Sequence, residues 1–151
     1  MGRDREFTEY VGTRWPRLVR TAVLLGCPRA EAEGVVRDAL VRCLTDWSKV
    51  RRADDRDAYV HRVLVERLRA AAKHRQPGGP SVDGHDPVLD RLHRLPEDQR
   101  LAVVLCDYAG LDELQTAIAT GLPSARVEAC LVPARAALAT TQPLTAFREA
   151  G

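Results

Sequence analysis

Apolar residues recur with helical spacing along almost the whole of this 151-residue chain. In the first segment Val11 and Leu18 share one helical face, and no stretch of the chain alternates apolar and polar residues for long enough to predict a strand. Helix breakers divide the pattern, with Gly26 and Pro28 between the first two helices and Gly110 in the second half. The sequence therefore predicts an all-α protein.

The first half of the chain is expected to contain three helices. The second helix is followed by a polar stretch from Ser48 to Arg56, in which Asp54 or Asp55 can cap the start of the third. The third helix turns Val60, Leu64 and other apolar side chains inward. Its opposite face is expected to hold polar side chains, namely His61, Arg62, Arg69, Lys73 and Arg75.

A segment rich in proline and glycine, QPGGPSVDGHDP, occupies residues 76–87. It has almost no apolar content and is typical of a flexible linker between two helical units. The sequence therefore predicts two small helical domains. The expected division is a first domain at 1–76, a linker at 77–86, a second domain at 87–139 and a tail at 140–151.

The second unit begins with a short helix that stops before Pro96, and a further helix runs on to Tyr108. Two more helices follow at Leu111–Ala119 and Ser124–Leu138, joined by a tight turn that contains Gly121. Helix, short glycine-bearing turn and second helix form the helix-turn-helix arrangement. By itself this arrangement leaves two interpretations open, a DNA-binding motif and a simple packing device.

The formal net charge of +2 hides an uneven distribution. Residues 1–76, the front half, contain 17 basic and 11 acidic residues, a net charge of +6. Residues 77–151, the back half, contain 6 basic and 10 acidic residues, a net charge of −4. A split of this kind favours contact between the front half and a polyanion, although an ordinary solvated surface would also explain it.

Several classes of function are disfavoured by the sequence. No apolar run approaches the roughly 20 residues that a membrane span needs, and the first residues lack the apolar core of a secretory signal. Cys27, Cys43, Cys106 and Cys130 lack the spacing of a zinc site, so we expect small apolar side chains in a reducing, cytoplasmic compartment. No metal, other cofactor or catalytic constellation is expected: Asp107 lacks a partnering histidine or nucleophile, and no phosphate loop is present.

Three ordered motifs identify a family resemblance: AEGVVRDAL at 32–40, AYVHRVLV at 58–65 and LPEDQRLAVVL at 95–105. With flanking residues they span about residues 5–139. In order and spacing they resemble the extracytoplasmic-function family of bacterial RNA polymerase sigma factors, especially its small actinobacterial members. The resemblance implies a sigma domain 2-like unit, a flexible linker and a sigma domain 4-like helix-turn-helix unit.

The resemblance also implies roles for individual helices. The second helix would bind the clamp helices of core RNA polymerase with an outward polar face: Glu33, Arg37, Asp38, Arg42 and Asp46. The third helix would open the minus-ten promoter element, which requires positive charge along the melted strand. The residues expected to bind DNA are Arg51, Arg52, Arg62, Arg67, Arg69, Lys73 and Arg75, together with Arg126 in the recognition helix.

This chain departs from the family pattern at several positions. Glu66 stands where relatives commonly have Asn, and residues 70–72 are alanines where relatives often carry aromatic or basic side chains. In the recognition helix Glu128 and Cys130 replace basic residues, and Pro133 lies in the helix interior. The helix-turn-helix is therefore interpreted as divergent, with little recognition of the minus-thirty-five element.

Two hypotheses follow from these observations. The first is a sigma factor that binds core RNA polymerase and promoter DNA, with most DNA contacts in the front half. The second is a degenerate sigma-like regulator that acts mainly through protein–protein contacts. In either case we also expect a regulatory protein partner, such as an anti-sigma factor, and no contact with a membrane. An enzymatic function is disfavoured.

Overall fold

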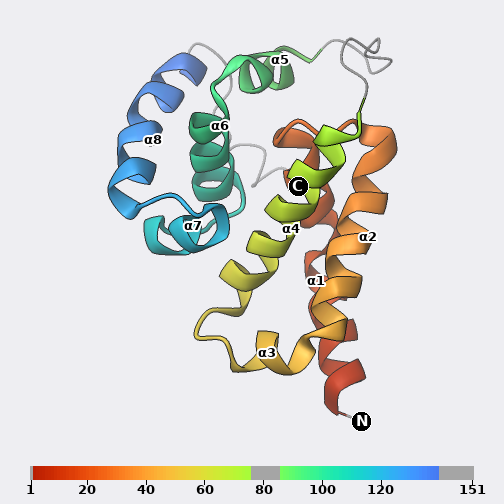
Figure 1. The fold of residues 1–151 in the computed structure, drawn as a ribbon. Helices are drawn as coiled ribbons and strands as arrows, with labels where there is room; N and C mark the ends of the chain where they lie inside the picture. Colours follow the sequence, from red (N-terminus) through yellow and green to blue (C-terminus); the bar gives the residue numbers. More distant parts are fainter. Residues whose placement is uncertain (1, 76–85, 140–151) are drawn as a thin grey trace.

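The computed structural model of the protein describes residues 2–75 and 86–139, and within these ranges it contains helices and no strand (Figure 1). This confirms the predicted all-α class. The predicted tail at 140–151 and all of the predicted linker except Asp86 lie outside the described residues. None of the helices in the described part is both long and apolar enough to cross a membrane.

The front half contains α1 (Gly2–Leu24), α2 (Arg29–Thr45), α3 (Trp47–Arg52) and α4 (Arg56–Lys73). Gly26 adopts φ +113 between α1 and α2, a left-handed conformation that glycine reaches without a steric penalty. Pro28 then stands at the N-cap position of α2. The short helix α3 was missed by the sequence interpretation, because only Trp47 and Val50 mark its buried side.

The core of the front half is built around Trp47, whose side chain is 1% exposed. Phe7 and Tyr10 of α1 approach its ring edge-on, with centroid separations of 5.6 and 6.1 Å. The Tyr10 hydroxyl also donates a hydrogen bond of 2.9 Å to Asp57 Oδ1 and so ties α1 to the first turn of α4. α2 and α4 pack side by side over this core (Figure 1).

The expected position of His61 was wrong. The sequence interpretation placed it on the outward face of α4, but the imidazole is only 6% exposed. Its Nδ1 lies 2.7 Å from the carbonyl oxygen of Asp57 one turn earlier. Because a carbonyl oxygen only accepts, Nδ1 donates, and this satisfies the polar atom inside the core.

The back half contains α5 (Pro87–Arg94), α6 (Glu97–Val103), the π-helical segment η1 (Val104–Tyr108), α7 (Glu113–Thr120) and α8 (Ser124–Leu138). Asp86, the last residue of the predicted linker, caps α5 by accepting hydrogen bonds from the Val88 and Leu89 amides. η1 extends α6, so the predicted helix up to Tyr108 is present but changes its hydrogen bonding midway.

The two helices α7 and α8 form the expected helix-turn-helix. α7 begins with a capping box in which Asp112 accepts from the Gln115 amide at 2.7 Å and Gln115 Oε1 accepts from the Asp112 amide at 2.8 Å. It ends at Gly121, whose φ of +81 favours glycine. Thr120, the last residue of α7, is buried, and its hydroxyl donates to the Thr116 carbonyl at 2.7 Å.

The two halves pack against each other along α4 and also at the end of α1, where Leu24 joins the back-half core. We call the contact along α4 the seam; it is made by Asp55, Val65 and Arg69 of the front half with Glu97, Leu101, Leu105, Leu111, Gln115 and Ala119 of the back half. α4 therefore lies between α2 on one side and α7 on the other (Figure 1). The sequence interpretation did not anticipate any contact between the two units.

Candidate nucleic-acid and polymerase interface

The orientation of α4 follows from its cap and its apolar side. Asp55, one of the two expected caps, accepts a hydrogen bond of 2.9 Å from the Ala58 amide and begins the helix. Val60 and Leu64 then point into the front-half core. Consequently Arg62 and Lys73 stay exposed on the outer side of the helix, as expected.

Most basic residues expected on this surface already have acidic partners. Arg62 Nε lies 3.3 Å from Glu66 Oε1, Arg69 Nε lies 3.0 Å from Glu97 Oε1, and Arg75 Nε lies 3.0 Å from Glu31 Oε2. Exposed ion pairs of this kind contribute about 0–1 kcal/mol each. The phosphate groups of a nucleic-acid backbone could therefore replace these carboxylates at a small cost in free energy.

The remaining expected DNA-binding residues of the front half lie on α3 and α4, and Arg67 projects from a different side of α4 than Arg62. Arg51 and Arg52 lie on α3 near the start of α4; Arg51 Nη1 is 3.9 Å from Glu6 Oε1, and Arg52 Nε donates to the Ser48 carbonyl. Arg67 is exposed on α4, and Lys73 is exposed at its far end. From Arg62 to Lys73 the helix rises by about 17 Å, at about 1.5 Å per residue, so the basic residues of α4 form a track rather than a pocket.

Stacking groups are scarce on this track. Tyr59 is half-buried and packs against the front-half core instead of standing free on the outer side. The rest of α4 contains no other aromatic residue. Base stacking on aromatic rings is therefore a weak feature of this surface, and charge is its main means of attraction.

The outer face of α2 groups the expected polymerase-binding residues. Glu33, Arg37 and Asp38 are exposed, and Arg42 Nε pairs with Asp46 Oδ2 at 3.3 Å at the end of the helix. The sequence interpretation missed Val41, which is 56% exposed among them. The spacing could have identified Val41, because it follows Arg37 by four positions and Asp38 by three and so shares their exposed side of the helix.

The recognition helix α8 has a largely apolar outer surface. Val132 is 71% exposed, and Ala125, Ala129 and Glu128 are also exposed. Arg126 Nη2, the expected DNA contact, lies 3.4 Å from Asp98 Oδ2 of α6.

Cys130 is buried in the back-half core, as expected for a small apolar cysteine side chain. The exposed side chains of α8 are mainly Ala, Val and Glu, and its exposed basic residues, Arg126 and Arg135, each pair with an aspartate.

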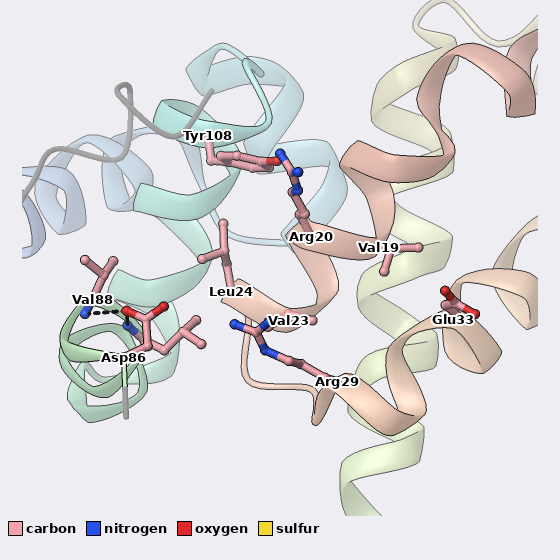
Figure 2. Close-up of a pocket in the computed structure, with 10 residues that line it drawn as sticks. Val19, Arg20, Val23, Leu24, Arg29, Glu33, Asp86, Val88 and Tyr108 are labelled. Carbon is pink, nitrogen blue, oxygen red and sulfur yellow. Dashed lines mark hydrogen bonds between the residues drawn. The ribbon is translucent and has the colours of Figure 1, made fainter. Parts of the chain in front are cut away.

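A cavity of about 430 Å³ lies between α1, α2, α5 and η1. Val19, Val23 and Leu24 supply apolar wall, and Arg20 extends beside Tyr108 (Figure 2). Glu33 of the α2 face also lines the cavity. The sequence could not indicate this cavity, because its walls come from four elements far apart in the chain.

The titratable groups of the core are held in their neutral forms. Burial lowers the pKa of His61 and raises the pKa of Cys43 to about 12, and it raises the pKa of Cys27 and of Cys106 as well. All four cysteines are free, and all but Cys106 are buried. The thiols of Cys27, Cys43 and Cys106 therefore remain protonated at neutral pH. Within the described ranges, no three His, Cys, Asp or Glu side chains are grouped to hold a metal ion.

Comparison with known proteins relates both halves to one family. Residues 85–138 match the family model described as Sigma-70, region 4. A curated protein named RNA polymerase sigma-E factor from Streptomyces coelicolor is 29% identical over 153 aligned positions, covering 91% of this chain and 86% of that protein. Its namesake from Streptomyces avermitilis is 30% identical, covering 91% of this chain and 85% of that protein.

Two solved structures share the fold. The sigma factor RpoE in complex with the anti-sigma factor NepR from Bartonella quintana matches with a TM-score of 0.76 and 18% identity, over 90% of this chain and 96% of that chain. CnrH in complex with the cytosolic domain of CnrY matches with a TM-score of 0.73 and 24% identity, over 92% of this chain and 88% of that chain. The likeness extends through both helical units.

Proposed function

This chain belongs to the extracytoplasmic-function family of RNA polymerase sigma factors, and we propose that it binds core RNA polymerase and directs initiation at particular promoters. The observation that carries the proposal is the arrangement of α2 and α4. Their apolar sides share one core, so their polar sides form two separate faces on the same rigid body. One face is available to polymerase while the other meets DNA.

The residues assigned to each face keep the roles that the family resemblance implies. The proposed polymerase face is Glu33, Arg37, Asp38, Arg42 and Asp46, with exposed Val41 as an added apolar contact. The proposed DNA track is Arg51, Arg52, Arg62, Arg67, Arg69, Lys73 and Arg75. We assign these roles to a first domain at 1–76 and place the helix-turn-helix in a second domain at 87–139. The protein acts by binding, without catalysis, in the cytoplasm where core polymerase works.

A second candidate function is a degenerate sigma-like regulator that acts mainly by protein contact. The observation that favours it is the outer face of α8, where Val132 and Ala129 are exposed and Arg126 pairs with Asp98. Base edges and phosphates are read by polar and basic side chains, of which this face has few. An anti-sigma type of regulatory partner is proposed in both cases, since RpoE is similar to this chain in fold and is seen bound to one.

Binding to core RNA polymerase, followed by transcription, distinguishes the sigma factor from the degenerate regulator. The full chain is mixed with purified core enzyme, recovered by pull-down, and the complex is used to transcribe a promoter library. A sigma factor gives polymerase binding and transcripts from a subset of promoters. Polymerase binding without transcripts favours the regulator, and absence of both contradicts membership of the initiation complex.

The DNA track is tested by replacing Arg62, Arg69 and Lys73 with Ala. Loss of three phosphate contacts weakens promoter-complex formation and flattens its dependence on salt by about 2 in the log–log slope, at about 0.7 per contact. The measurement is complex formation from 50 to 300 mM salt, roughly the range in which such effects are large. A control that replaces Arg5, Arg17 and Arg94, exposed residues outside the track, keeps the original slope. An unchanged slope in the first variant would rule out the track.

A further inference from the structure

The cavity between α1, α2, α5 and η1 has walls that are held in place by packing and by a hydrogen bond. Leu24, at the end of α1, is part of the back-half core, so this end of α1 is fixed against the back half. His93 Nε2 lies 3.3 Å from the Val23 carbonyl oxygen and donates a hydrogen bond that ties α5 to α1. The cavity is therefore preformed, and its volume of about 430 Å³ lies within the range of about 300–1,000 Å³ that small-molecule sites occupy.

The lining of the cavity is apolar over much of its surface. Val19 and Val23 of α1 supply apolar side chains from the front half, and Val88 and Leu89 of α5 supply them from the back half. Contact with these side chains removes apolar ligand surface from water, which favours binding. A ligand that fits this lining therefore has an apolar body.

Two hydrogen-bond donors come together at one end of the cavity. The side chain of Arg20, on α1, extends to the hydroxyl end of Tyr108, on η1 (Figure 2). Within residues 2–75 and 86–139, neither the Arg20 guanidinium nor the Tyr108 hydroxyl has a hydrogen-bond or ion-pair partner. Tyr108 is only 2% exposed, and the polar atom of a buried tyrosine usually has a partner. This end of the cavity therefore offers donors that lack an acceptor.

The acidic residues of the lining do not supply that acceptor. The Asp86 carboxylate accepts hydrogen bonds of 3.0 and 3.4 Å from two backbone amides in the first turn of α5 and so caps that helix. Glu33 extends from α2 at a place apart from Arg20 and Tyr108, where it would repel a bound anion toward them (Figure 2). A carboxylate matches the planar guanidinium and also accepts from a phenolic hydroxyl.

We propose that this cavity binds a small molecule with an apolar body and one carboxylate, of the aliphatic or arylalkyl carboxylic acid class. The carboxylate accepts hydrogen bonds from Arg20 and Tyr108, and the apolar body lies between α1 and α5. The ligand contacts both halves of the folded chain, so its binding stabilises the folded state by mass action. The site adds a ligand to the proposed function and does not rest on it.

Two carboxylate probes test the site in the full chain, octanoate as the aliphatic acid and phenylbutyrate as the arylalkyl acid. The shifts of isotope-labelled backbone amides are followed by NMR during titration, below the concentration at which octanoate forms micelles. At least one probe is expected to shift the amides of α1, α5 and η1 around the cavity in a saturable way and to raise the Tm. Octanol, which has the same chain length as octanoate but no charge, is expected to have a Kd about tenfold higher than octanoate.

Variants at the two donors test how the carboxylate is held. Arg20→Gln and Tyr108→Phe are each expected to raise the Kd for the carboxylate by about tenfold, because a hydrogen bond to a charged group is lost. Neither variant changes the Kd for octanol. The matched controls are Arg17→Gln, at an exposed position of α1 outside the lining, and Tyr59→Phe, at a half-buried position of α4. Both controls keep the original Kd for the carboxylate.

The proposal would be overturned if neither carboxylate gave saturable shifts around the cavity. Equal affinities for octanoate and octanol would also overturn it, as would a Kd that neither donor variant changes. The polymerase pull-down of the original chain is a separate measurement. Loss of polymerase binding counts against the proposed sigma function and leaves the titrations intact, so the two failures can be told apart.

Discussion

At the scale of single residues, His61 gives the front half a dependence on pH. Burial lowers its pKa, while the nearby Asp57 opposes the shift and Arg14 reinforces it. The unfolded chain has an ordinary histidine pKa of about 6.5, so below this value the unfolded state takes up a proton that the folded state resists. The free energy of unfolding therefore falls as the pH drops below about 6.5.

Replacing His61 with Gln tests this source of acid sensitivity. We expect a flatter dependence of the urea midpoint on pH between 7.5 and 5.5, roughly the interval around the ordinary histidine pKa. His74→Gln is the control, because His74 is exposed at the end of α4 and its side chain is not in the core. Equal pH dependence in both variants would contradict the assignment to His61.

At the scale of single elements, α8 continues through Pro133 despite the missing amide hydrogen. The residue one turn earlier, Ala129, is exposed, so water can reach the carbonyl that loses its partner. The buried side of the helix, with Val127 and Leu131, holds it against the back-half core. Packing therefore overrides the local cost of proline, and α8 has the bounds that the sequence predicts.

Pro133→Ala is expected to stabilise the protein by up to about 3 kcal/mol, the difference between proline and alanine in a helix interior. The measurement is the free energy of unfolding in urea. Pro123→Ala serves as the control, because Pro123 stands at the N-cap of α8 where no helical hydrogen bond is lost. Both changes increase the conformational entropy of the unfolded chain by the same amount. A gain in the free energy of unfolding that is seen only at position 133 therefore comes from the folded helix. An equal effect at both positions would contradict this account.

Local signals account for the elements that the sequence could predict. Gly26, Asp55 and Gly121 mark their boundaries through backbone conformation or capping, which depend on neighbours in the chain. The short α3 and the π-helical turn of η1 were missed because few residues mark them. His61 was misplaced because its burial depends on helices packed from elsewhere in the sequence.

At the scale of the whole molecule, the seam couples the two helical units. Val65 and Val60 are both 1% exposed on α4, but Val60 belongs to the front-half core and Val65 to the seam. No local pattern separates the two valines, since each is an apolar residue in an amphipathic helix. The contact between the units could therefore not be predicted from the sequence, although the charge split was consistent with it.

Val65→Ala is expected to reduce amide hydrogen-exchange protection in α7 by roughly tenfold, because about 1.6 kcal/mol of apolar contact is lost with two methyl groups. Val60→Ala removes the same groups from the front-half core and leaves protection in α7 unchanged. The measurement is hydrogen exchange of the full chain under native conditions. Equal loss of protection in α7 from both variants would indicate one undivided core.

The pair between Arg69 and Glu97 affects how mutagenesis of the track should be interpreted. Replacing Arg69 with Ala removes the proposed phosphate contact and also an ion pair that joins the two halves, whereas Arg62 pairs only within α4. A change in DNA binding caused by the Arg69 substitution therefore reports two contacts at once, and the Arg62 substitution is the cleaner measure of the proposed DNA track.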